Sequence, residues 1–492
     1  MKYVLGIDFG GGSSKTTLLS EDGTIAATSS KEYNSYTDAG GIVEQDPCDW
    51  YLATKYNVKN VLEKSGVSAS DIVCISLDAA THTAVLLDEN FTPIRRSIYW
   101  TDTRSLKQVN YLRKNYLEKI KDIMLHSPDT IWTLPQLLWV KENEPEVWRK
   151  TKRIMFSKDY VRHMITGDFA TDYIEAEGSM LFDYNTLDWS EELLSIADIT
   201  RDMLPELHRP DDIVGSVTKA AAEELGLCEG TPVLCGTTDT VMEVLASGSV
   251  KAGQMTIKLA TAGRICIITD QPFKDRDIVN YSHVIKGLWY PGTATKACAS
   301  SYRWYRDTFG EDYSVLDAGA EKIPAGCEGL IYHPYLNGEL TPYADPLLCG
   351  SFTGIRFSHT KAHFSRAVME GVALSLLDCK NKIEQLGIPH FDHAAIIGGG
   401  SYSPIWRQIV ADTLNFKLIK KNNSDSSLGS AMMAGVVSCV FSSYEDAISK
   451  CTEDVCTTIP NEQNSKIYQK TYEKYKAIHD ALADVYHKYS NI

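Results

Sequence analysis

The first thirty residues alternate short apolar runs with glycine and small polar residues. Residues 3–8 (YVLGID) form one apolar run, and residues 16–19 (TTLL) form a second run that ends before the turn signal at 21–23 (EDG). Apolar and β-branched residues between turn signals are typical of β-strands. We therefore expect strands over 3–8, 16–19 and 25–29, joined by tight turns.

The turn at residues 10–15 (GGGSSK) has the residue types of a phosphate-binding P-loop without its spacing. A P-loop has a glycine before the lysine and a helix after it, whereas here a serine precedes Lys15 and a strand pattern follows. A strand–turn–strand can hold a nucleotide differently, with N–H groups of residues 10–13 and Lys15 facing phosphate and Asp8 holding hydrated Mg²⁺. An ordinary glycine-rich hairpin with a solvated aspartate fits this stretch equally well.

Later segments combine strand and helix patterns in an order that indicates an α/β protein of two halves. Residues 71–87 read as two strands, and residues 104–228 are mostly helical by pattern. Residues 254–270 repeat the strand–turn–strand pattern of the N-terminus, and residues 394–415 read as a strand, three glycines and a helix. The repeated hairpin predicts an internal duplication with its boundary near residues 248–253.

Composition narrows the class of protein. The 492 residues are 43% hydrophobic and 23% charged, with a formal net charge of −15, which is typical of a soluble globular chain and argues against nucleic acid or an anionic membrane as partner. The twelve cysteines lack paired spacing, so we expect reduced core residues and no metal–cysteine site. With neither a signal peptide nor a membrane-spanning run expected, we expect a cytoplasmic protein.

Asp239 is the candidate for acid–base chemistry. Residues 230–248 read as a strand, a turn of small residues and a helix that begins near Asp239. A carboxylate there can accept a proton from an attacking hydroxyl group, but aspartate is also a favoured helix N-cap, and the cap is the simpler interpretation of this segment alone. The turns at 260–263 and 398–400 offer further backbone N–H groups, and residues 426–440 predict a closely packed helix of small residues.

Several motifs, in order over about residues 1–440, resemble the FGGY family of sugar kinases, and within it the xylulose kinases. They are GIDFG (6–10), EQDP with a following tryptophan (44–50), WTDTR (100–104), KDYVRHMITGDFATD (158–172), HPYLNGELTP (333–342), GIRFSHTKAHFSRAVMEGVA (354–373), GGGSYSPIWRQIVADT (398–413) and SSLGSAMMAG (426–435).

This resemblance implies two actin-like (ribonuclease H-like) α/β domains with a nucleotide cleft between them. Residues 1–248 would bind sugar and carry the first phosphate loop; residues 249–492 would bind the nucleotide and end in a helical tail of about fifty residues. The implied reaction is ATP-dependent transfer of the γ-phosphate to a small sugar, D-xylulose first, giving D-xylulose 5-phosphate. The implied partners are sugar, ATP and Mg²⁺, with a homodimer as one option for assembly.

The resemblance also implies roles for single residues. Asp239 matches the catalytic base and Asp8 the Mg²⁺-associated aspartate. Four positions match residues that contact phosphate: Gly11, Gly12, Lys15 and Thr261. Four more match the surroundings of the nucleotide: Ala299, Arg303, Gly399 and Ser403. The sugar-binding positions are Thr81, His82, Trp100, Asp102 and Thr240.

The chain departs from the family pattern at several of these positions. Three glycines at 10–12 replace the usual Gly-Thr-Thr or Gly-Thr-Ser, and Thr240 stands where xylulose kinases have asparagine. Several such departures line the expected sugar pocket, among them Thr240 and the stretch at residues 80–82 (ATH), where the family has Gln-Met-His. Other substrates therefore stay open, among them gluconate, ribulose or a polyol. The lost hydroxyl groups also leave open a weakened kinase that acts as a sugar-binding regulatory protein.

Overall fold

The structure is a computed structural model that describes residues 1–38, 41–275 and 277–489. The chain divides into two compact units, each built from three segments. Unit 1 comprises Met1–Val250, Tyr281–Gly287 and Asn423–Thr452; unit 2 comprises Lys251–Asn280, Leu288–Asn422 and Glu453–Ile492. Two short stretches beyond residue 250 therefore belong to unit 1.

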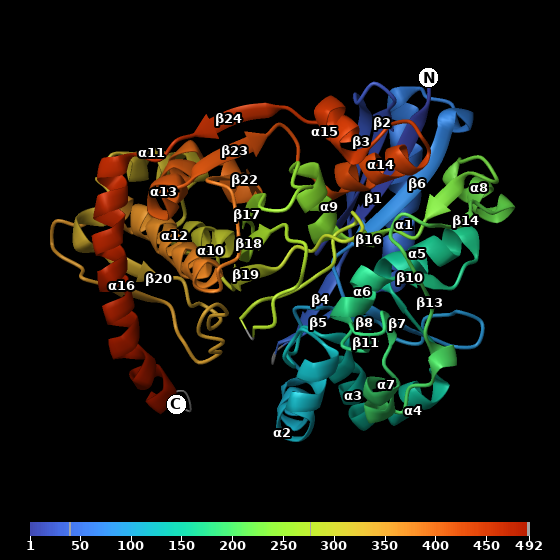
Figure 1. Ribbon diagram of the computed structural model, residues 1–492, viewed down its shortest axis with the longest axis horizontal. Helices are drawn as coiled ribbons and strands as arrows, with labels where there is room; N and C mark the ends of the chain where they lie inside the picture. The colour runs from blue at the N-terminus through green and yellow to red at the C-terminus, as the bar shows by residue number, and fades with distance from the viewer. Residues whose placement is uncertain (39–40, 276, 490–492) are drawn as a thin grey trace. The chain divides into compact units, whose positions relative to one another are not determined.

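Unit 1 is built on one mixed sheet in the order β14-β15-β6-β1-β2-β3, with β16 also paired to β6 (Figure 1). Strands β1, β2 and β3 are antiparallel, and β6 runs parallel to β1. The expected N-terminal strands are confirmed with slightly longer bounds. The strands of this sheet are β1 (Tyr3–Phe9), β2 (Ser13–Ser20), β3 (Ile25–Glu32), β6 (Ile72–Ala79), β14 (Ile213–Ser216), β15 (Pro232–Leu234) and β16 (Thr237–Thr238).

Helices cover both faces of this sheet. Apolar residues of α1 (Pro47–Ser65), α5 (Ser157–Thr166) and α8 (Lys219–Leu225) share a buried cluster with Leu5 and Ile7 of β1. Side chains alternate along a strand, so the intervening Gly6 faces the other side.

There α14 (Ser426–Val437) packs so closely that a Cβ on Gly6 would lie 2.0 Å from the Ser427 carbonyl oxygen. Figure 1 shows this helix beside β1 although some 420 residues separate them in sequence. The predicted small-residue helix is thus confirmed. It also packs closely on α9 (Asp239–Ala246), where a Cβ on Gly429 would lie 2.2 Å from the Met242 carbonyl oxygen.

The rest of unit 1 consists of further helices and four small sheets. The helices are α2 (Leu106–Ile123), α3 (Thr133–Asn143), α4 (Pro145–Lys150), α6 (Tyr173–Gly178), α7 (Glu191–Ala197) and α15 (Tyr444–Cys451). The small sheets pair β4 (Ser35–Asp38), β5 (Ile42–Gln45) and β8 (Ser97–Ile98); β7 (Ala84–Leu87) and β9 (Arg153–Phe156); β10 (Ala170–Asp172) and β13 (Glu206–His208); β11 (Phe182–Asp183) and β12 (Asp188–Trp189).

Unit 2 repeats the topology of the first sheet. Its strand order is β19-β18-β17-β22-β23-β24, in which the first three strands are antiparallel, β22 and β23 run parallel to β17, and β24 is antiparallel again. The predicted duplication of the hairpin is visible in this repeat. The strands are β17 (Met255–Leu259), β18 (Gly263–Ile267), β19 (Gly292–Thr295), β22 (His393–Ile397), β23 (Lys417–Lys421) and β24 (Asp454–Thr458), with a separate pair β20 (Ile331–His333) and β21 (Ser351–Thr353).

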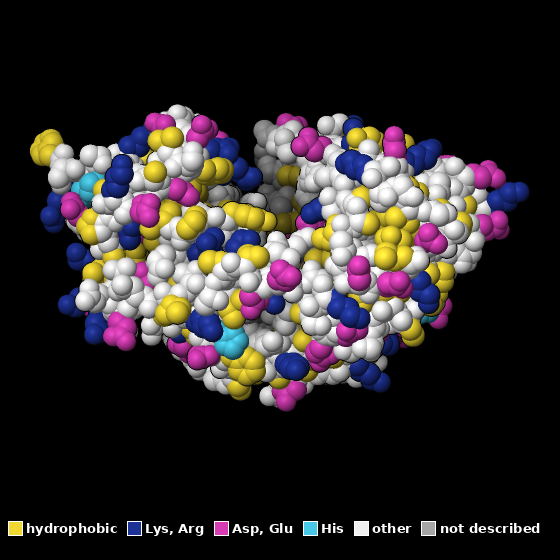
Figure 2. All heavy atoms as spheres, turned by 90° about the horizontal axis from the view of Figure 1, so that it is seen from above, with side chains coloured by type: hydrophobic (Ala, Val, Ile, Leu, Met, Phe, Trp, Pro, Cys, Tyr) yellow, Lys and Arg dark blue, Asp and Glu magenta, His cyan; other side chains and the backbone are white. Residues whose placement is uncertain are grey.

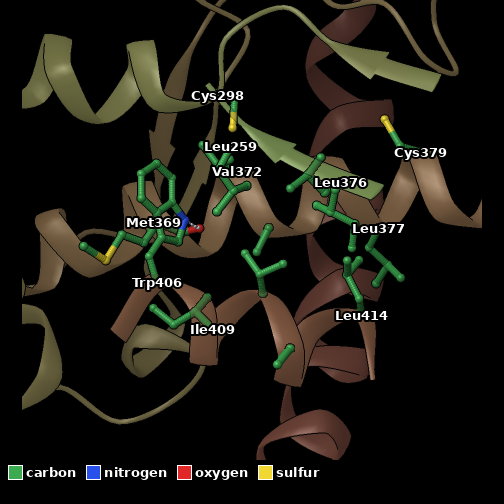
Figure 3. Packing of buried hydrophobic residues seen from close by; sticks show 14 of the residues in the cluster. Leu259, Cys298, Met369, Val372, Leu376, Leu377, Cys379, Trp406, Ile409 and Leu414 are labelled. Carbon is green, nitrogen blue, oxygen red and sulfur yellow. Dashed lines mark hydrogen bonds between the residues drawn. The ribbon is translucent and has the colours of Figure 1, made fainter. Parts of the chain in front are cut away.

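The core of unit 2 lies between this sheet and its helices. Figure 3 shows Trp406 of α13 among aliphatic residues of α12, with its indole Nε1 donating to the Met369 carbonyl oxygen at 3.2 Å. Tyr468 of the C-terminal helix donates to Glu370 of α12 at 2.9 Å, so this helix is packed against the unit. The helices are α10 (Ala299–Phe309), α11 (Tyr313–Glu321), α12 (Lys361–Gln385), α13 (Pro404–Leu414) and α16 (Glu462–Tyr489).

The surface and the helices agree with the composition of the chain. On the face seen in Figure 2, acidic and basic side chains are interspersed. Among the helices that the structure describes, none is both long and apolar enough to cross a membrane. All twelve cysteines are free thiols, and most of them are buried or partly buried.

Candidate active site

A row of polar side chains crosses the sheet of unit 1. Asp8 in β1 is directly paired with Lys15 in β2 and with Asp78 in β6, and Thr237 in β16 is paired with Asp78. Directly paired residues lie side by side on the same face of a sheet. The register therefore gathers two carboxyl groups and a lysine next to the glycine turn, and Asp239 follows two residues after Thr237.

Asp8 and Asp78 form a pair of interacting carboxyl groups. Asp78 is fully buried and accepts a hydrogen bond from Ser430 Oγ at 2.5 Å. Burial, and then the charges of Asp425 and Asp239, raise the pKa of Asp8 to about 8. Burial and the adjacent Asp8 also raise the pKa of Asp78 well above its ordinary value. Two adjacent buried carboxylates repel each other, so each group disfavours the charged form of the other.

Asp239 occupies the first turn of α9. Thr238 is the N-cap and makes no side-chain cap bond, so the interpretation of Asp239 as the cap is wrong. The preceding turn requires Gly236, whose φ is +74° and whose added Cβ would lie 2.1 Å from the Leu77 carbonyl oxygen. Thr240 Oγ1 donates to Asp239 Oδ1 at 3.1 Å. The carboxylate is thus oriented by its neighbour and not committed to a cap.

The glycine turn between β1 and β2 leaves open space at one residue. A Cβ on Gly12 would meet nothing within 4 Å, whereas a Cβ on Gly11 would lie 3.1 Å from the Tyr99 hydroxyl oxygen. Lys15 Nζ lies 2.7 Å from Asp425 Oδ2. Asp425 is also the N-cap of α14, so the lysine is held beside a helix N-terminus.

His82 lies in the turn between β6 and β7 and is held on several sides. Its backbone has φ +72°, and its N–H donates to Glu175 Oε1 at 2.7 Å. Its Nε2 lies 2.8 Å from the Tyr281 hydroxyl group, and its ring lies 4.8 Å from that of Trp132. A Cβ on Gly178 would lie 1.7 Å from the ring, so this glycine makes room for the imidazole.

The other predicted sugar-binding residues lie on different parts of unit 1. Thr81 precedes His82 in the same turn, and the ring of Trp100 lies 5.9 Å from that of Tyr99. The buried carboxylate of Asp102 accepts from Val43 N at 2.6 Å and pairs with Arg104 at 2.7 Å. Because these donors already occupy it, Asp102 has little capacity left for a sugar hydroxyl group.

Sequence reasoning missed the buried acids that support this region. Asp172 Oδ1 accepts from Thr237 Oγ1 at 2.9 Å, and its other oxygen lies 2.9 Å from Lys158 Nζ. Glu177 accepts from Ser282 N at 2.8 Å and anchors the segment that contains Tyr281. Only the motif at residues 158–172 indicated this network, because its other contacts join residues 65 to 105 positions apart.

Unit 2 contains a cavity of about 530 Å³ next to its own hairpin turn. All five residues of this unit that were predicted to lie near the nucleotide line the cavity, namely Thr261, Ala299, Arg303, Gly399 and Ser403. Its lining is Ala260, Thr261, Ala299, Ser300, Tyr302, Arg303, Tyr313, Asp317, Gly399, Gly400, Tyr402, Ser403 and Trp406.

The cavity has a backbone-lined part and an aromatic part. A Cβ on Gly399 would meet nothing within 4 Å, and Ser403 Oγ caps α13 by accepting from Trp406 N at 3.3 Å. Arg303 is exposed and forms no ion pair within the part of the chain that the structure describes. Tyr302 and Tyr313 stack with ring centroids 5.4 Å apart. A phosphate group fits the first part and a flat base the second.

Comparison with known proteins identifies relatives over the whole chain. Residues 3–246 match the N-terminal domain, and residues 234–438 the C-terminal domain, of the FGGY family of carbohydrate kinases. The chain is 34% identical to the xylulose kinase of Bacillus subtilis, covering 99% of this chain and 98% of that protein. It is 27% identical to the gluconokinase of Bacillus licheniformis, with 99% and 98% covered. The crystal structure of xylulose kinase from Rhodospirillum rubrum superimposes with a TM-score of 0.90 at 26% identity, covering 99% of this chain and all of that one.

Proposed function

Since the chain belongs to the FGGY family of carbohydrate kinases, we propose that it transfers the γ-phosphate of ATP to D-xylulose. The observation that carries this proposal is the position of Asp239, an oriented carboxylate in the first turn of α9 beside the Asp8 row. Relatives at about a third identity over nearly their full length are named xylulose kinase.

Asp239 is the proposed general base. Its carboxylate accepts the proton of the sugar hydroxyl group as that oxygen attacks the γ-phosphorus and ADP leaves. The hydrogen bond from Thr240 orients the acceptor oxygen. The proton ends on Asp239 and passes to solvent after the product leaves, so atoms and charges balance over the cycle.

Asp8 is the proposed ligand for Mg²⁺. Its Oδ1 atom is buried and accepts no hydrogen bond from an N–H or hydroxyl group of the described residues, and a bound cation would lower the pKa that burial raises and so favour the carboxylate. Mg²⁺ commonly uses one or two carboxylates together with water and phosphate oxygens, so the absence of a three-ligand cluster among the described residues does not conflict with this role. When bound, the ion supplies positive charge to the phosphate oxygens.

The cavity of unit 2 is the proposed nucleotide site. Thr261 and the open face of Gly399 receive the phosphate groups, Arg303 adds positive charge, and Ala299 and Ser403 border the nucleotide. In unit 1, Gly11, Gly12 and Lys15 face the transferred phosphate; Lys15 would have to exchange Asp425 for it. We also predict that the two units close on the substrates, and the homodimer expected from the sequence stays a prediction.

The surroundings of His82 favour a neutral sugar over a sugar acid. Glu175 bonds to the His82 backbone, and Glu177 anchors the Tyr281 segment. Burial raises the pKa of both glutamates well above the usual value. The nearby cations Lys158 and Arg162 already pair with buried aspartates. Neither of these two cations is left to pair with the carboxylate of gluconate, so gluconate, supported by the gluconokinase relatives, is the second candidate.

A substrate panel tests the proposal. The purified protein is supplied with ATP, Mg²⁺ and one acceptor at a time, namely D-xylulose, D-ribulose, gluconate or glycerol, and ADP release is measured. We expect the highest kcat/KM with D-xylulose, and ³¹P NMR should show a 5-phosphate. A higher kcat/KM with gluconate than with D-xylulose would make gluconate the substrate. No turnover with any acceptor would refute the kinase assignment.

His82→Ala locates the sugar within the protein. Tyr281 holds the imidazole at Nε2 in the predicted pocket, and loss of the imidazole should reduce kcat/KM for the sugar about 10- to 100-fold, as for a lost hydrogen bond to a substrate hydroxyl group. KM for ATP should change little. Equal effects on both substrates would place the sugar elsewhere.

A further inference from the structure

Asp317 lies at the aromatic end of the unit 2 cavity. In α11, Tyr313 and Asp317 are four residues apart and therefore share one face of the helix, and both line the cavity. Tyr302 of α10 stacks on Tyr313 and donates its hydroxyl hydrogen to Asp317 Oδ1 at 2.7 Å. A carboxylate is thus fixed beside two aromatic rings in the lining of the cavity.

Burial fixes the protonation of Tyr302. Tyr302 is almost fully buried, and burial raises its pKa far above neutral pH. It therefore stays a hydrogen-bond donor. Asp317 is partly exposed on the cavity side, and no donor of the described residues other than Tyr302 bonds to it. Its second oxygen can accept a hydrogen from a bound molecule.

We propose that Asp317 selects the base of the nucleotide by accepting a hydrogen bond from an exocyclic amino group, as found at position 6 of adenine. This inference rests on the proposed function, because it assumes that the cavity binds the nucleotide. A 6-oxo purine presents oxygen lone pairs at the same point and is repelled by the carboxylate. Guanine could turn its N1–H and amino group toward a carboxylate, but that pairing uses both oxygens, and Tyr302 already donates to Oδ1 and competes for it.

The hydrogen bond from Tyr302 to Asp317 contributes to recognition of the base. The tyrosine holds the carboxylate in one orientation, so the acceptor oxygen is already directed into the cavity before a nucleotide binds. Preorganised polar groups discriminate strongly because a wrong ligand leaves them unpaired. Tyr302 is accordingly a positioning residue, and Asp317 is the residue that determines specificity.

Steady-state kinetics with ATP, ITP and GTP test this inference. For the unaltered protein we expect kcat/KM for ATP to exceed that for ITP and GTP at least tenfold. Asp317→Asn keeps the shape of the side chain but can present an N–H to a 6-oxo group. It should therefore lower the ratio of kcat/KM for ATP to kcat/KM for ITP about tenfold. Tyr302→Phe should narrow the ratio less and leave the KM for sugar unchanged. Asp312→Asn, one turn earlier and outside the cavity lining, is the matched control and should preserve the ratio.

The outcomes separate this inference from the proposed function. Turnover with ATP and ITP at equal kcat/KM, a preference for GTP, or an unchanged ratio in Asp317→Asn would overturn the role of Asp317 while the kinase assignment stands. No turnover and no quenching of intrinsic fluorescence by any nucleotide would instead refute the nucleotide site itself. If Asp317→Asn fails to fold, the triphosphate of purine riboside, which lacks the 6-amino group, tests the unaltered protein: a tenfold lower kcat/KM than ATP supports the inference, and equality overturns it.

Discussion

The two sheets repeat one topology but carry opposite chemistry at equivalent positions. One pair before the end of the first hairpin, Asp8 faces Lys15, and the parallel neighbour is Asp78. One pair before the end of the second hairpin, Lys258 faces Arg264, and the parallel neighbour is Ile397. Unit 1 thus places two acids beside its turn where unit 2 places basic and aliphatic residues.

This difference indicates how a duplicated fold divides one reaction. Carboxylates that interact with a cation and accept a proton are needed where the phosphoryl group is transferred. A nucleotide site needs backbone donors and flat apolar surfaces, and acids next to its phosphates would weaken binding. The shared topology supplies a turn at the same place in both sheets, and the side chains around each turn decide its role.

Asp239→Asn should produce the largest loss of activity. The amide keeps the shape of the side chain but cannot accept the proton, so kcat should fall about 10²- to 10⁴-fold, as is typical for the loss of a general base. ATP binding, measured by fluorescence titration, should persist because the proposed nucleotide site lies in unit 2. A folded variant with unchanged kcat would show that another group accepts the proton.

Neutralising the charged residue at the equivalent position of each sheet tests the comparison directly. Asp8→Asn should lower kcat about 10²-fold or more, the scale of losing one electrostatic contact to the transition state, and should raise the Mg²⁺ concentration needed for half-maximal rate. Lys258→Gln changes the matching position of unit 2 and should alter kcat less than about threefold. Comparable losses of kcat in both variants would mean that the residues beside the two hairpin turns contribute equally to the reaction, and the proposed difference between the units would be wrong.

The sequence predicted the hairpins and the start of α9 because local patterns determine them. Strand bounds, the helix at Asp239 and the glycine-rich turn after β22 all follow from runs of apolar residues between small ones. The family resemblance then supplied the actin-like fold and the cavity residues Arg303 and Ser403, which local pattern alone would not have connected.

Long-range contacts could not be predicted in this way. Whether Asp78 would lie against Asp8 depends on the register of two strands that are 70 residues apart. Lys15 and Asp425 are separated by 410 positions, and nothing in either segment indicates the other. The inclusion of residues 281–287 in unit 1 likewise depends on tertiary packing through Glu177.

Asp78→Asn should change stability in a pH-dependent way. In the folded protein the pKa of Asp78 is well above the ordinary value of 3.8, so folding takes up a proton above that pH. The stability associated with this group is therefore complete below about pH 4 and decreases as pH rises toward the folded-state pKa, by at most about 1.4 kcal/mol per pH unit. Asparagine is neutral and can still pair with Ser430 and Asp8.

The variant should consequently melt near the wild-type temperature at pH 5 and a few degrees above it at pH 7.5. This shift corresponds to about 1–3 kcal/mol for a unit of this size. Differential scanning fluorimetry across this range measures it. Asp122→Asn, an exposed position at the end of α2, should show no such trend. Parallel curves for Asp78→Asn and wild type would mean that Asp78 is ionised in the folded protein.

The smallest effects should come from Gly12 and Gly399, one glycine in each unit that faces open space in a proposed phosphate-binding turn. Neither Gly12 nor Gly399 has an atom within 4 Å of an added Cβ, so alanine should leave the melting temperature within about 2 °C. If phosphate oxygens occupy that space, each methyl group should raise KM for ATP about three- to tenfold by displacing them from backbone N–H groups. Gly399→Ala should also weaken the binding of ADP, because unit 2 is proposed to hold the whole nucleotide, whereas Gly12→Ala should weaken the binding of ATP and leave ADP binding unchanged.

Gly398→Ala is the control for backbone strain. The φ of Gly398 is +85° and an added Cβ would lie 2.7 Å from the Leu259 carbonyl oxygen, so this variant should lower stability. Equal weakening of ADP by the Gly12 and Gly399 variants would show that both turns hold the same phosphates and would remove the proposed division between the units.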